Sequence, residues 1–382
     1  MTTGQMALVV ILPLYILDSG NSLGAAALVF AMRSLGSMAV NLPASLALAR
    51  FGVRPVMLAG VFMIGFGALV LAISNSTFRI ALATLVFGAG MGSWLLARMS
   101  YITQKMAIHR RGKAMSVLAG IQRLGMLVGP IAGGLGVQVL GYQSVFLLIA
   151  ISAAATLIPI YLFCQPVTGN VVPDNSAVQP AYNVLTLAPK ILYKYRKVFL
   201  RAGLFVFCLQ FVREQRRLLI TLWGASLGLD ADAIGFAVSL TSIADMLTFP
   251  VAGYLMDNKG RKISGMLCIF TMALMMILLP FTGSYGAFLL VAMLSGAGNG
   301  LGSGIMLTLG ADFAPEQELN QFLGVWRMFC DLGAMTGPLF TSIATSLLIA
   351  FNTTAVVGIL GGIALWRLVE ETLPKANPDS EE

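Results

Sequence analysis

Apolar stretches of membrane-spanning length follow one another along the chain, separated by short polar segments. A helix that crosses a bilayer needs about 20 mostly apolar residues. The pattern predicts twelve spanning helices, which cover residues 5–17, 24–48, 55–73, 78–102, 114–139, 143–164, 199–226, 233–256, 263–281, 285–311, 322–346 and 349–369. We therefore expect an all-α polytopic membrane protein.

The one long polar stretch divides the predicted helices into two sets of six. It is rich in proline at its start and ends, over residues 183–197, in an alternation of apolar and basic residues typical of an amphipathic helix on a membrane surface. The predicted organisation is a six-helix bundle over 1–164, a cytoplasmic linker over 165–197, a six-helix bundle over 198–370 and a cytoplasmic tail over 371–382.

The first predicted span is too short to cross a membrane. Residues 5–17 would extend about 20 Å at about 1.5 Å per residue, whereas the hydrocarbon core is about 30 Å thick. The stretch also lacks the basic flank of a signal peptide. We expect a truncated first helix that upstream sequence would complete, the alternative being a helix that locally thins the bilayer.

Composition narrows the class of protein further. Hydrophobic residues make up 58% of the chain and charged residues only 10%, against about 25% charged in an ordinary globular domain. Too few polar residues exist to cover a water-facing surface, which excludes a disordered chain, a nucleic-acid-binding module and nearly every soluble enzyme. The four cysteines lie at no ligand spacing, so neither a metal site nor a disulfide framework is predicted.

Basic residues concentrate in the loops on one side of the predicted membrane. Cytoplasmic loops carry an excess of Lys and Arg, so this side, with both termini, is predicted to face the cytoplasm. In the opposite loops, Arg79 is the one basic residue, and Asp18, Asp230 and Asp232 also lie there. We expect a multi-pass protein of the plasma (inner) membrane, whose cytoplasmic bases are Arg50, Arg54, Lys105, Arg110, Arg111, Lys113, Lys190, Lys194, Arg196, Lys197, Arg201, Lys259, Arg261 and Lys262.

Glycine and proline positions repeat at one fixed offset. Residues 88–92 match residues 296–300, and Gly52 matches Gly260, each pair being 208 positions apart. The same offset relates three residues of the fifth span to three of the eleventh: Gly125, Gly129 and Pro130 to Gly333, Gly337 and Pro338. One shared register predicts a duplicated unit, and therefore two pseudo-symmetric six-helix bundles, a known plan of membrane transporters.

The loop after the eighth span resembles a signature of the major facilitator superfamily, Gly-x-Leu-x-Asp-Arg-x-Gly-Arg-Lys. Residues 253–262 read Gly-Tyr-Leu-Met-Asp-Asn-Lys-Gly-Arg-Lys, whereas the first-half copy, residues 45–54, is eroded and has Ala49 where the acid is expected. Residues 125–134 resemble the Gly-x-x-x-Gly-Pro-x-x-Gly-Gly signature of the antiporters of the superfamily, although Thr84 replaces the usual arginine of the fourth span. The resemblance, closest to the drug:proton antiporter-like branch, implies a monomeric transporter.

The resemblance implies a gate at the two loop copies and a hinge on the fifth and eleventh spans. A carboxylate at Asp257 can pair with nearby bases or with the start of a helix and so latch one conformation, the alternative being a plain loop-end charge. Glycines four apart let helices approach closely, and Pro130 favours a kink. The gating residues are Arg50, Gly52, Arg54, Gly253, Asp257, Gly260, Arg261 and Lys262; the hinge residues are Gly125, Gly129, Pro130, Gly133, Gly134, Gly337 and Pro338.

Charged residues inside the predicted spans are the candidates for substrate and proton binding, because such charges are costly in a membrane and mostly functional. Apart from end residues, they avoid the third, sixth, ninth and twelfth spans, which the family places at the periphery. The candidates are Arg33, Arg98, Arg123, Arg213, Glu214, Arg217, Asp245, Arg327 and Asp331.

The arrangement of these charges suggests roles for some of them. A rise of about 1.5 Å per residue places several near the membrane midplane. Glu214 and Asp245 are candidate proton sites, and Asp245 or a ligand is the expected partner of the arginines on the seventh span. Arg327 and Asp331, four residues apart, form either part of the site or a structural ion pair. Arg216 faces a crevice or extends toward the membrane surface.

The favoured function is proton-coupled efflux of small organic molecules by alternating access, with a proton gradient as the energy source and no cofactor. An importer or exchanger of organic anions is the first alternative, because seven arginines face three acids within the spans. A non-transporting scaffold or receptor is the second, because the first-half motif is eroded and the first span is short.

Overall fold

The computed structural model describes residues 1–105, 108–164, 189–315 and 318–373. These residues form helices joined by short turns and contain no strand, which confirms the all-α prediction for the part of the chain described. Most of the expected linker and the end of the expected tail lie outside the described residues.

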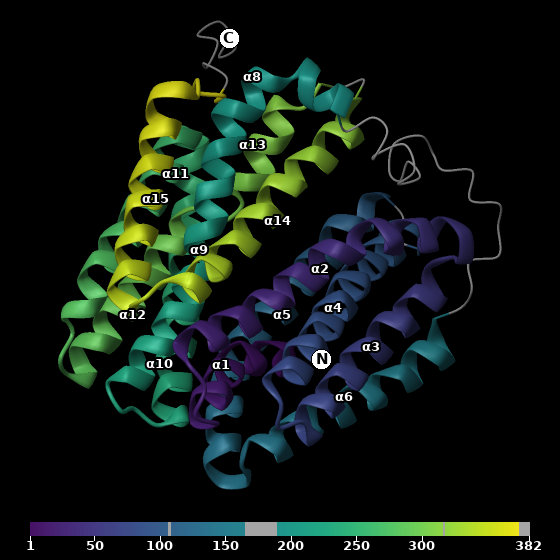
Figure 1. Cartoon of the computed structure of the whole chain (residues 1–382). Coiled ribbons are helices and arrows are strands. Elements are labelled where there is room, and N and C mark those ends of the chain that lie inside the picture. The colour runs from purple at the N-terminus through teal and green to yellow at the C-terminus, as the bar shows by residue number, and fades with distance from the viewer. Residues whose placement is uncertain (106–107, 165–188, 316–317, 374–382) are drawn as a thin grey trace, which may run out of the picture.

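Six helices form the N-terminal half, purple and blue in Figure 1. Their bounds lie within six residues of the predicted spans. They are α1 (Thr2–Asp18), α2 (Leu23–Phe51), α3 (Val53–Ile73), α4 (Thr77–Lys105), α5 (Ile108–Leu140) and α6 (Tyr142–Phe163).

The C-terminal half, teal to yellow in Figure 1, repeats this arrangement with interruptions. A short helix α8 (Arg196–Val198) and a π-helical turn (Phe199–Gly203) precede α9 (Leu204–Ser226). The remaining helices are α10 (Ala231–Asn258), α11 (Arg261–Leu278), a 3-10 turn (Leu279–Phe281), α12 (Tyr285–Leu301), α13 (Ile305–Phe313), α14 (Leu319–Ile343) and α15 (Leu347–Leu368).

The tenth predicted span is not one continuous helix, which corrects the prediction over residues 285–311. The helix ends after Leu301 and resumes at Ile305, and Gly304 takes a positive φ of 88°. Glycine adopts that backbone conformation without the steric cost that a side chain would bring. The sequence Gly-Ser-Gly at residues 302–304 thus interrupts the helix.

The repeat inferred from the sequence reappears in the contacts between helices. Gly129 lies against the backbone carbonyl of Thr3 on α1, and Gly337 lies against that of Phe211 on α9. Both members of the second pair are 208 positions after those of the first. The same register relates the Gly88–Arg33 contact to Gly296–Thr241, and Gly92–Ser37 to Gly300–Asp245.

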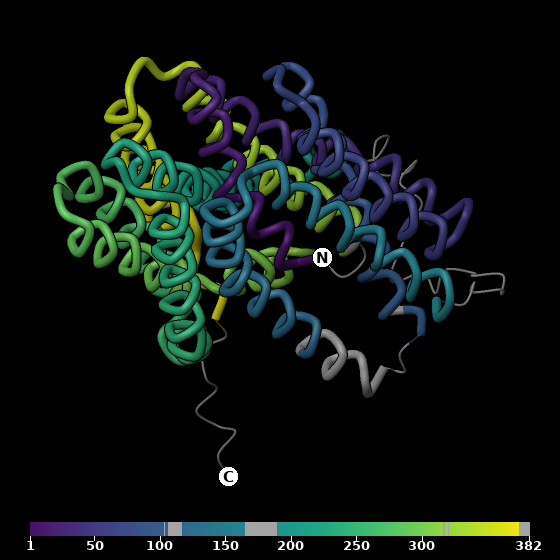
Figure 2. Tube along the Cα trace, turned by 90° about the horizontal axis from the view of Figure 1, so that it is seen from below, coloured from purple at the N-terminus to yellow at the C-terminus, as the bar shows by residue number. Residues whose placement is uncertain are grey.

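Among the described residues, the halves share a hydrophobic core at one end of the molecule. We call the end near residues 164 and 189 the linker end, and the opposite end, with the turn at Gly141, the far end. The largest core cluster joins the N-terminal half to far-end residues of the other half, such as Leu222 and Phe351. A second cluster, at the linker end, belongs to the C-terminal half alone. Figure 2, a view from below, shows the halves side by side, with the N-terminus near the middle.

By length and composition, nine helical segments among the described residues could cross a membrane, with α12 and α13 counted together as the segment Tyr285–Phe313. The 17-residue α1 is a shorter apolar helix, and α9 and α14 are absent from the nine. α9 carries four charged residues between positions 213 and 217. The charges that mark the candidate site therefore weaken the hydropathy signal of the helix that holds them.

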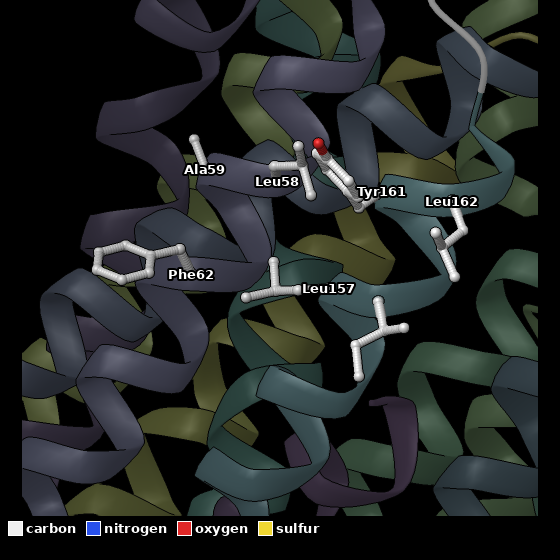
Figure 3. Close-up of a pocket in the computed structure, with 7 residues that line it drawn as sticks. Leu58, Ala59, Phe62, Leu157, Tyr161 and Leu162 are labelled. Carbon is white, nitrogen blue, oxygen red and sulfur yellow. The ribbon is translucent and has the colours of Figure 1, made fainter.

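An open groove on the outer face of the N-terminal half holds no charged side chain (Figure 3). It has a volume of about 530 Å³ between α3 and α6, two of the helices predicted to be peripheral. The surface is therefore suited to contact lipid rather than to bind a polar ligand. Its lining residues are Leu58, Ala59, Phe62, Leu157, Ile158, Tyr161 and Leu162.

Candidate functional site

A buried ion pair joins the two halves. The Arg33 guanidinium on α2 donates from Nη2 to Glu214 Oε2 on α9 at 2.8 Å, and the two side chains are only 11% and 7% exposed. Arg217 Nη1, one turn along α9, donates to the other carboxylate oxygen at 2.7 Å. Glu214 thus accepts one arginine from each half, and both of its oxygens are engaged.

A second polar contact joins the halves between α2 and α14. Asn41 Nδ2 donates to Asp331 Oδ2 at 2.9 Å, and Arg327 Nε donates to Asp331 Oδ1 at 3.1 Å. The Arg327 side chain is 61% exposed, and Asp331 is more buried at 16%. The expected Arg327–Asp331 pair therefore exists, and it reaches the other half through the amide of Asn41.

The break between α12 and α13 receives two arginines. Arg213 of α9 donates from Nη2 to the carbonyl oxygen of Gly302 at 2.9 Å. Arg123 of α5, in the other half, approaches the Ser303 hydroxyl at 3.4 Å and lies over the Phe249 ring, 3.9 Å from its centroid. Guanidinium groups from both halves thus meet at one interrupted helix.

Asp245 is held within the C-terminal half, beside the same break. Asn299 Nδ2 on α12 donates to Asp245 Oδ2 at 2.9 Å. Arg216 is 6% exposed, and its Nη1 reaches the Ser295 hydroxyl at 3.5 Å, while its Nε has no partner among the described residues. Arg216 therefore lies buried beside a polar partner and does not extend toward the membrane surface, which was one of its two expected placements.

The expected direct pairing of Asp245 with the arginines of the seventh span is wrong for the described residues. No guanidinium nitrogen of α9 lies within 4.0 Å of an Asp245 oxygen in that part of the chain, and Glu214 takes Arg217 instead. The reason is register, since Arg217 lies one turn after Glu214 on the same helix and reaches its carboxylate directly.

Arg98 stands apart from these clusters. It lies on α4 with its guanidinium 5.8 Å from the centroid of the Trp94 ring, and its Nε is buried without a partner among the described residues. The structure therefore brings eight of the nine intramembrane candidates into three groups, around Glu214, Asp331 and the helix break, and leaves Arg98 separate.

The predicted hinge glycines lie at contacts between helices. Gly125, Gly129 and Gly133 face α1, whereas Gly134 meets the backbone of Ala231 on α10, in the other half. α5 runs through Pro130 without interruption. Gly337 faces α9, and Pro338 lies within α14. The stripe of glycines therefore packs α5 against both halves at once.

The predicted gate lies at the linker end. Arg261 contacts Asp312 at 3.3 Å and the carbonyl of Met256 at 2.6 Å, and its distance to Asp257 is 3.7 Å. The Asp257 side chain is 76% exposed. Among the described residues, its loose approach to Arg261 is the one ion pair that it makes. Gly253 has open space beside it.

Equivalent loop bases make equivalent contacts in the two halves. Arg54 donates to the carbonyl of Tyr161 at 2.7 Å, and Lys262, 208 positions later, donates to that of Trp366 at 2.8 Å. The first contact joins the start of α3 to the end of α6, and the second joins the start of α11 to the end of α15. Arg50 lies over the ring of Phe51, 5.3 Å from its centroid.

Two glycines in the gate allow a matched test of stability. Gly52 and Gly260 both have positive φ, 83° and 106°. A Cβ at Gly52 would meet open space, but at Gly260 it would collide with the Glu371 carboxylate, which accepts the backbone N–H of Arg261 at 2.7 Å. We expect Gly52→Ala to lower stability by about 1 kcal/mol and Gly260→Ala by about 2 kcal/mol, because only the latter also displaces a helix cap.

Thermal unfolding of the purified variants measures this difference. A lower melting temperature for Gly260→Ala than for Gly52→Ala is the expected result. Equal melting temperatures would show that the Glu371 cap contributes nothing to stability.

Comparison with known proteins identifies the family. The model of the Major Facilitator Superfamily matches residues 1–214 and 216–382 of this chain. The chain belongs to the Major Facilitator Superfamily. Membership bears out the resemblance drawn from residues 125–134 and 253–262, and it places the chain in a family of transporters rather than enzymes.

Two relatives within the superfamily are named for drug resistance. The chain is 24% identical to the multidrug resistance protein MdtG of Klebsiella pneumoniae, over 76% of this chain and 69% of MdtG. It is 26% identical to the multi-drug resistance efflux pump PmrA homolog of Lactococcus lactis, over 61% of this chain and 57% of that protein. The match to another relative covers only 20% of that relative's length.

A solved transporter structure shows the same fold. A POT family transporter, crystallised in complex with a thioalcohol conjugated peptide, superposes with a TM-score of 0.77 over 96% of this chain and 93% of that one. The two are 14% identical, so the likeness concerns the fold alone.

Several polar residues of these clusters carried little or no signal in the sequence. Asn41, Ser295, Asn299 and Ser303 are uncharged, and only their contacts with charged residues single them out. One weak signal existed for Asn299, which interrupts the otherwise matching glycine-rich repeat opposite Met91.

Proposed function

We propose that this superfamily member is a secondary transporter that exports small organic molecules in exchange for protons by alternating access. The observation that carries the proposal is the buried Arg33–Glu214 pair between the halves, 2.8 Å long. A carboxylate that holds two halves together can link their separation to its own protonation.

The coupling would work through the charge of Glu214. Ionised, the carboxylate binds Arg33 of the other half and stabilises the arrangement in which the far end is closed. Protonated, it no longer offers a charge to Arg33, and the cost of leaving that arginine buried favours separation of the halves there. A proton thus acts as a ligand with different affinity for two conformations, as a population shift requires.

The described contacts suit one of the two states of alternating access. Gly24 meets Ser342, Gly134 meets Ala231, and Pro130 meets Gly235, and all three contacts lie toward the far end. The excess of basic residues indicates that the linker end faces the cytoplasm. The far end then faces the outside of the cell, and in this state it is closed. In the opposite state these contacts would part while the linker end closes.

The drug-resistance names of MdtG and the PmrA homolog support efflux as the direction. Import or exchange of organic anions is the second candidate, because seven arginines face three acids in the spans. We further propose a monomer in the plasma (inner) membrane with cytoplasmic termini, powered by the proton gradient without a cofactor.

Transport into proteoliposomes tests the proposal. A liposome lumen that is one pH unit more acidic than the outside supplies about 1.4 kcal/mol per proton. Exchange of one substrate molecule for one proton can then drive roughly tenfold accumulation of the substrate in the lumen. We expect accumulation of at least one member of a panel containing ethidium and carboxyfluorescein, and its loss on addition of a protonophore.

Accumulation that survives the protonophore would contradict proton coupling. Movement of no panel member above protein-free liposomes would favour a scaffold or receptor. Accumulation that requires an alkaline lumen would favour import.

A further inference from the structure

The break between α12 and α13 lies where charge from both halves converges. Arg213 reaches the carbonyl of Gly302 from α9, and Arg123 reaches the hydroxyl of Ser303 from α5. Gly302 and Ser303 are consecutive, so the two guanidinium groups approach adjacent residues from opposite halves. Interrupted helices are where some membrane transporters hold charged ligands.

Neither arginine has an acidic partner in the described part of the chain. No carboxylate oxygen lies within 4.0 Å of Arg123, Arg213 or the neighbouring Arg216 among those residues. The Nε atoms of Arg213 and Arg216 are buried without a partner there. Of the acids close to these arginines, Asp245 is bound by Asn299 at 2.9 Å, and Glu214 is bound by Arg33 and Arg217.

Neutral partners do not offset this concentration of charge. A carbonyl, a hydroxyl and the Phe249 ring can orient the two half-buried guanidinium groups, but removing a cation even partly from water without a counter-charge is costly. An anionic group placed between them would form charge-assisted hydrogen bonds, for which the planar guanidinium fork is well suited.

We propose that Arg123 and Arg213, at the interrupted α12–α13 helix, bind a carboxylate or similar anionic group of the transported molecule. The inference rests on the proposed transport function and specifies its substrate class. Since one arginine belongs to each half, an anion that bridges them binds more tightly when the halves place both within reach. Such a substrate contributes to the conformational change because its affinity differs between the two states.

Ligand-induced thermal stabilisation of the full chain in neutral detergent tests the proposal without a gradient or anionic lipid. The probes are small aromatic and aliphatic monocarboxylates, each paired with its uncharged amide and with an amine of the same size. We expect at least one carboxylate to stabilise the protein where its amide and amine do not.

Variants assign that binding to the two arginines. Loss of one charged hydrogen-bond donor weakens binding about 10- to 100-fold, so we expect this effect from Arg123→Gln and from Arg213→Gln. Arg213→Lys keeps the charge and should retain part of the affinity, which guards against misfolding of the glutamine variant. Arg367→Gln, an exposed change at the linker end of α15, is the matched control and should bind normally.

Several outcomes overturn the inference: no preference for any carboxylate over its amide, stabilisation by the amines alone, or full affinity in both glutamine variants. These results are separable from the test of the proposed function. Carboxylate binding with no gradient-driven transport contradicts proton coupling and supports the site. Gradient-driven transport of amines alone supports coupling and contradicts the site.

Discussion

Replacing Glu214 by glutamine is expected to uncouple transport from the proton gradient and to open the far end of the molecule. Glutamine has nearly the shape of the protonated carboxyl group but cannot ionise. Arg33 and Arg217 would keep their charges and lose the negative charge that they share. Removing one member of a buried ion pair costs about 3–5 kcal/mol.

That cost should fall mainly on the far-end-closed state, which is the described state in which Arg33 reaches across to α9; under the proposed mechanism the pair separates in the other state. If this state loses about 3 kcal/mol relative to the other, the ratio of the two populations changes about 100-fold. The response of the transport rate to a pH gradient should disappear at the same time, because the variant lacks the carboxylate that we propose binds the proton.

Spin labels on the far-end loops measure the first effect. Asn75 and Gly283 are exposed, lie 208 positions apart and occupy equivalent turns, and a side chain at Gly283 meets open space. The four native cysteines are buried, so labels on introduced cysteines report these sites. A longer distance between the labels in Glu214→Gln than in the parent is the expected result.

Arg217→Gln is the comparison variant, because it removes the contact within α9 and keeps the contact between halves. It should lengthen the label distance less than Glu214→Gln does. If Glu214→Gln kept both the parental distance and the parental response to the gradient, Glu214 would not be the coupling carboxylate.

Adding a single methyl group at Gly134 should also inhibit transport strongly. A Cβ there would collide with the backbone of Ala231 in the other half. Backbone cannot rotate out of the way as a side chain can, and overpacking of this kind costs about 1–3 kcal/mol. We expect Gly134→Ala to disfavour far-end closure about 10- to 100-fold and to slow turnover accordingly.

Gly120→Ala controls for the change in helix propensity. Gly120 lies on the same helix, with nothing within 4 Å of the position its Cβ would take. Alanine favours a helix over glycine by up to about 1 kcal/mol at either position. Turnover and the Asn75–Gly283 label distance should change in Gly134→Ala and remain parental in Gly120→Ala. Parental behaviour of both would exclude close packing at Gly134 as a requirement for closure.

Local apolar pattern was sufficient to predict most of the fold. Helix ends fell close to prediction because the turns coincide with glycines such as Gly52 and Gly260, whose positive φ ends one helix before the next begins. The interruption at residues 302–304 escaped prediction, since glycines in membrane helices also serve close packing, as Gly296 and Gly298 do.

The candidate site was only partly predictable. Its charged members stood out because charge is rare in apolar spans. Their partners depend on how the halves approach each other, which local sequence does not encode. Arg33 and Glu214 are 181 positions apart, and Asp245 is held by an uncharged amide rather than by an arginine.

The shared register of the two halves has a consequence for how this chain could change. Glycine contacts such as Gly129–Thr3 and Gly337–Phe211 are inherited in duplicate, whereas Arg33, Arg213 and Asp245 correspond to Thr241, Gln5 and Ser37 in the other half. The scaffold therefore remained symmetric while the ionisable groups diverged. Mutation and selection could replace one set of charged residues by another, and so change the transported molecule, without altering how any two helices pack.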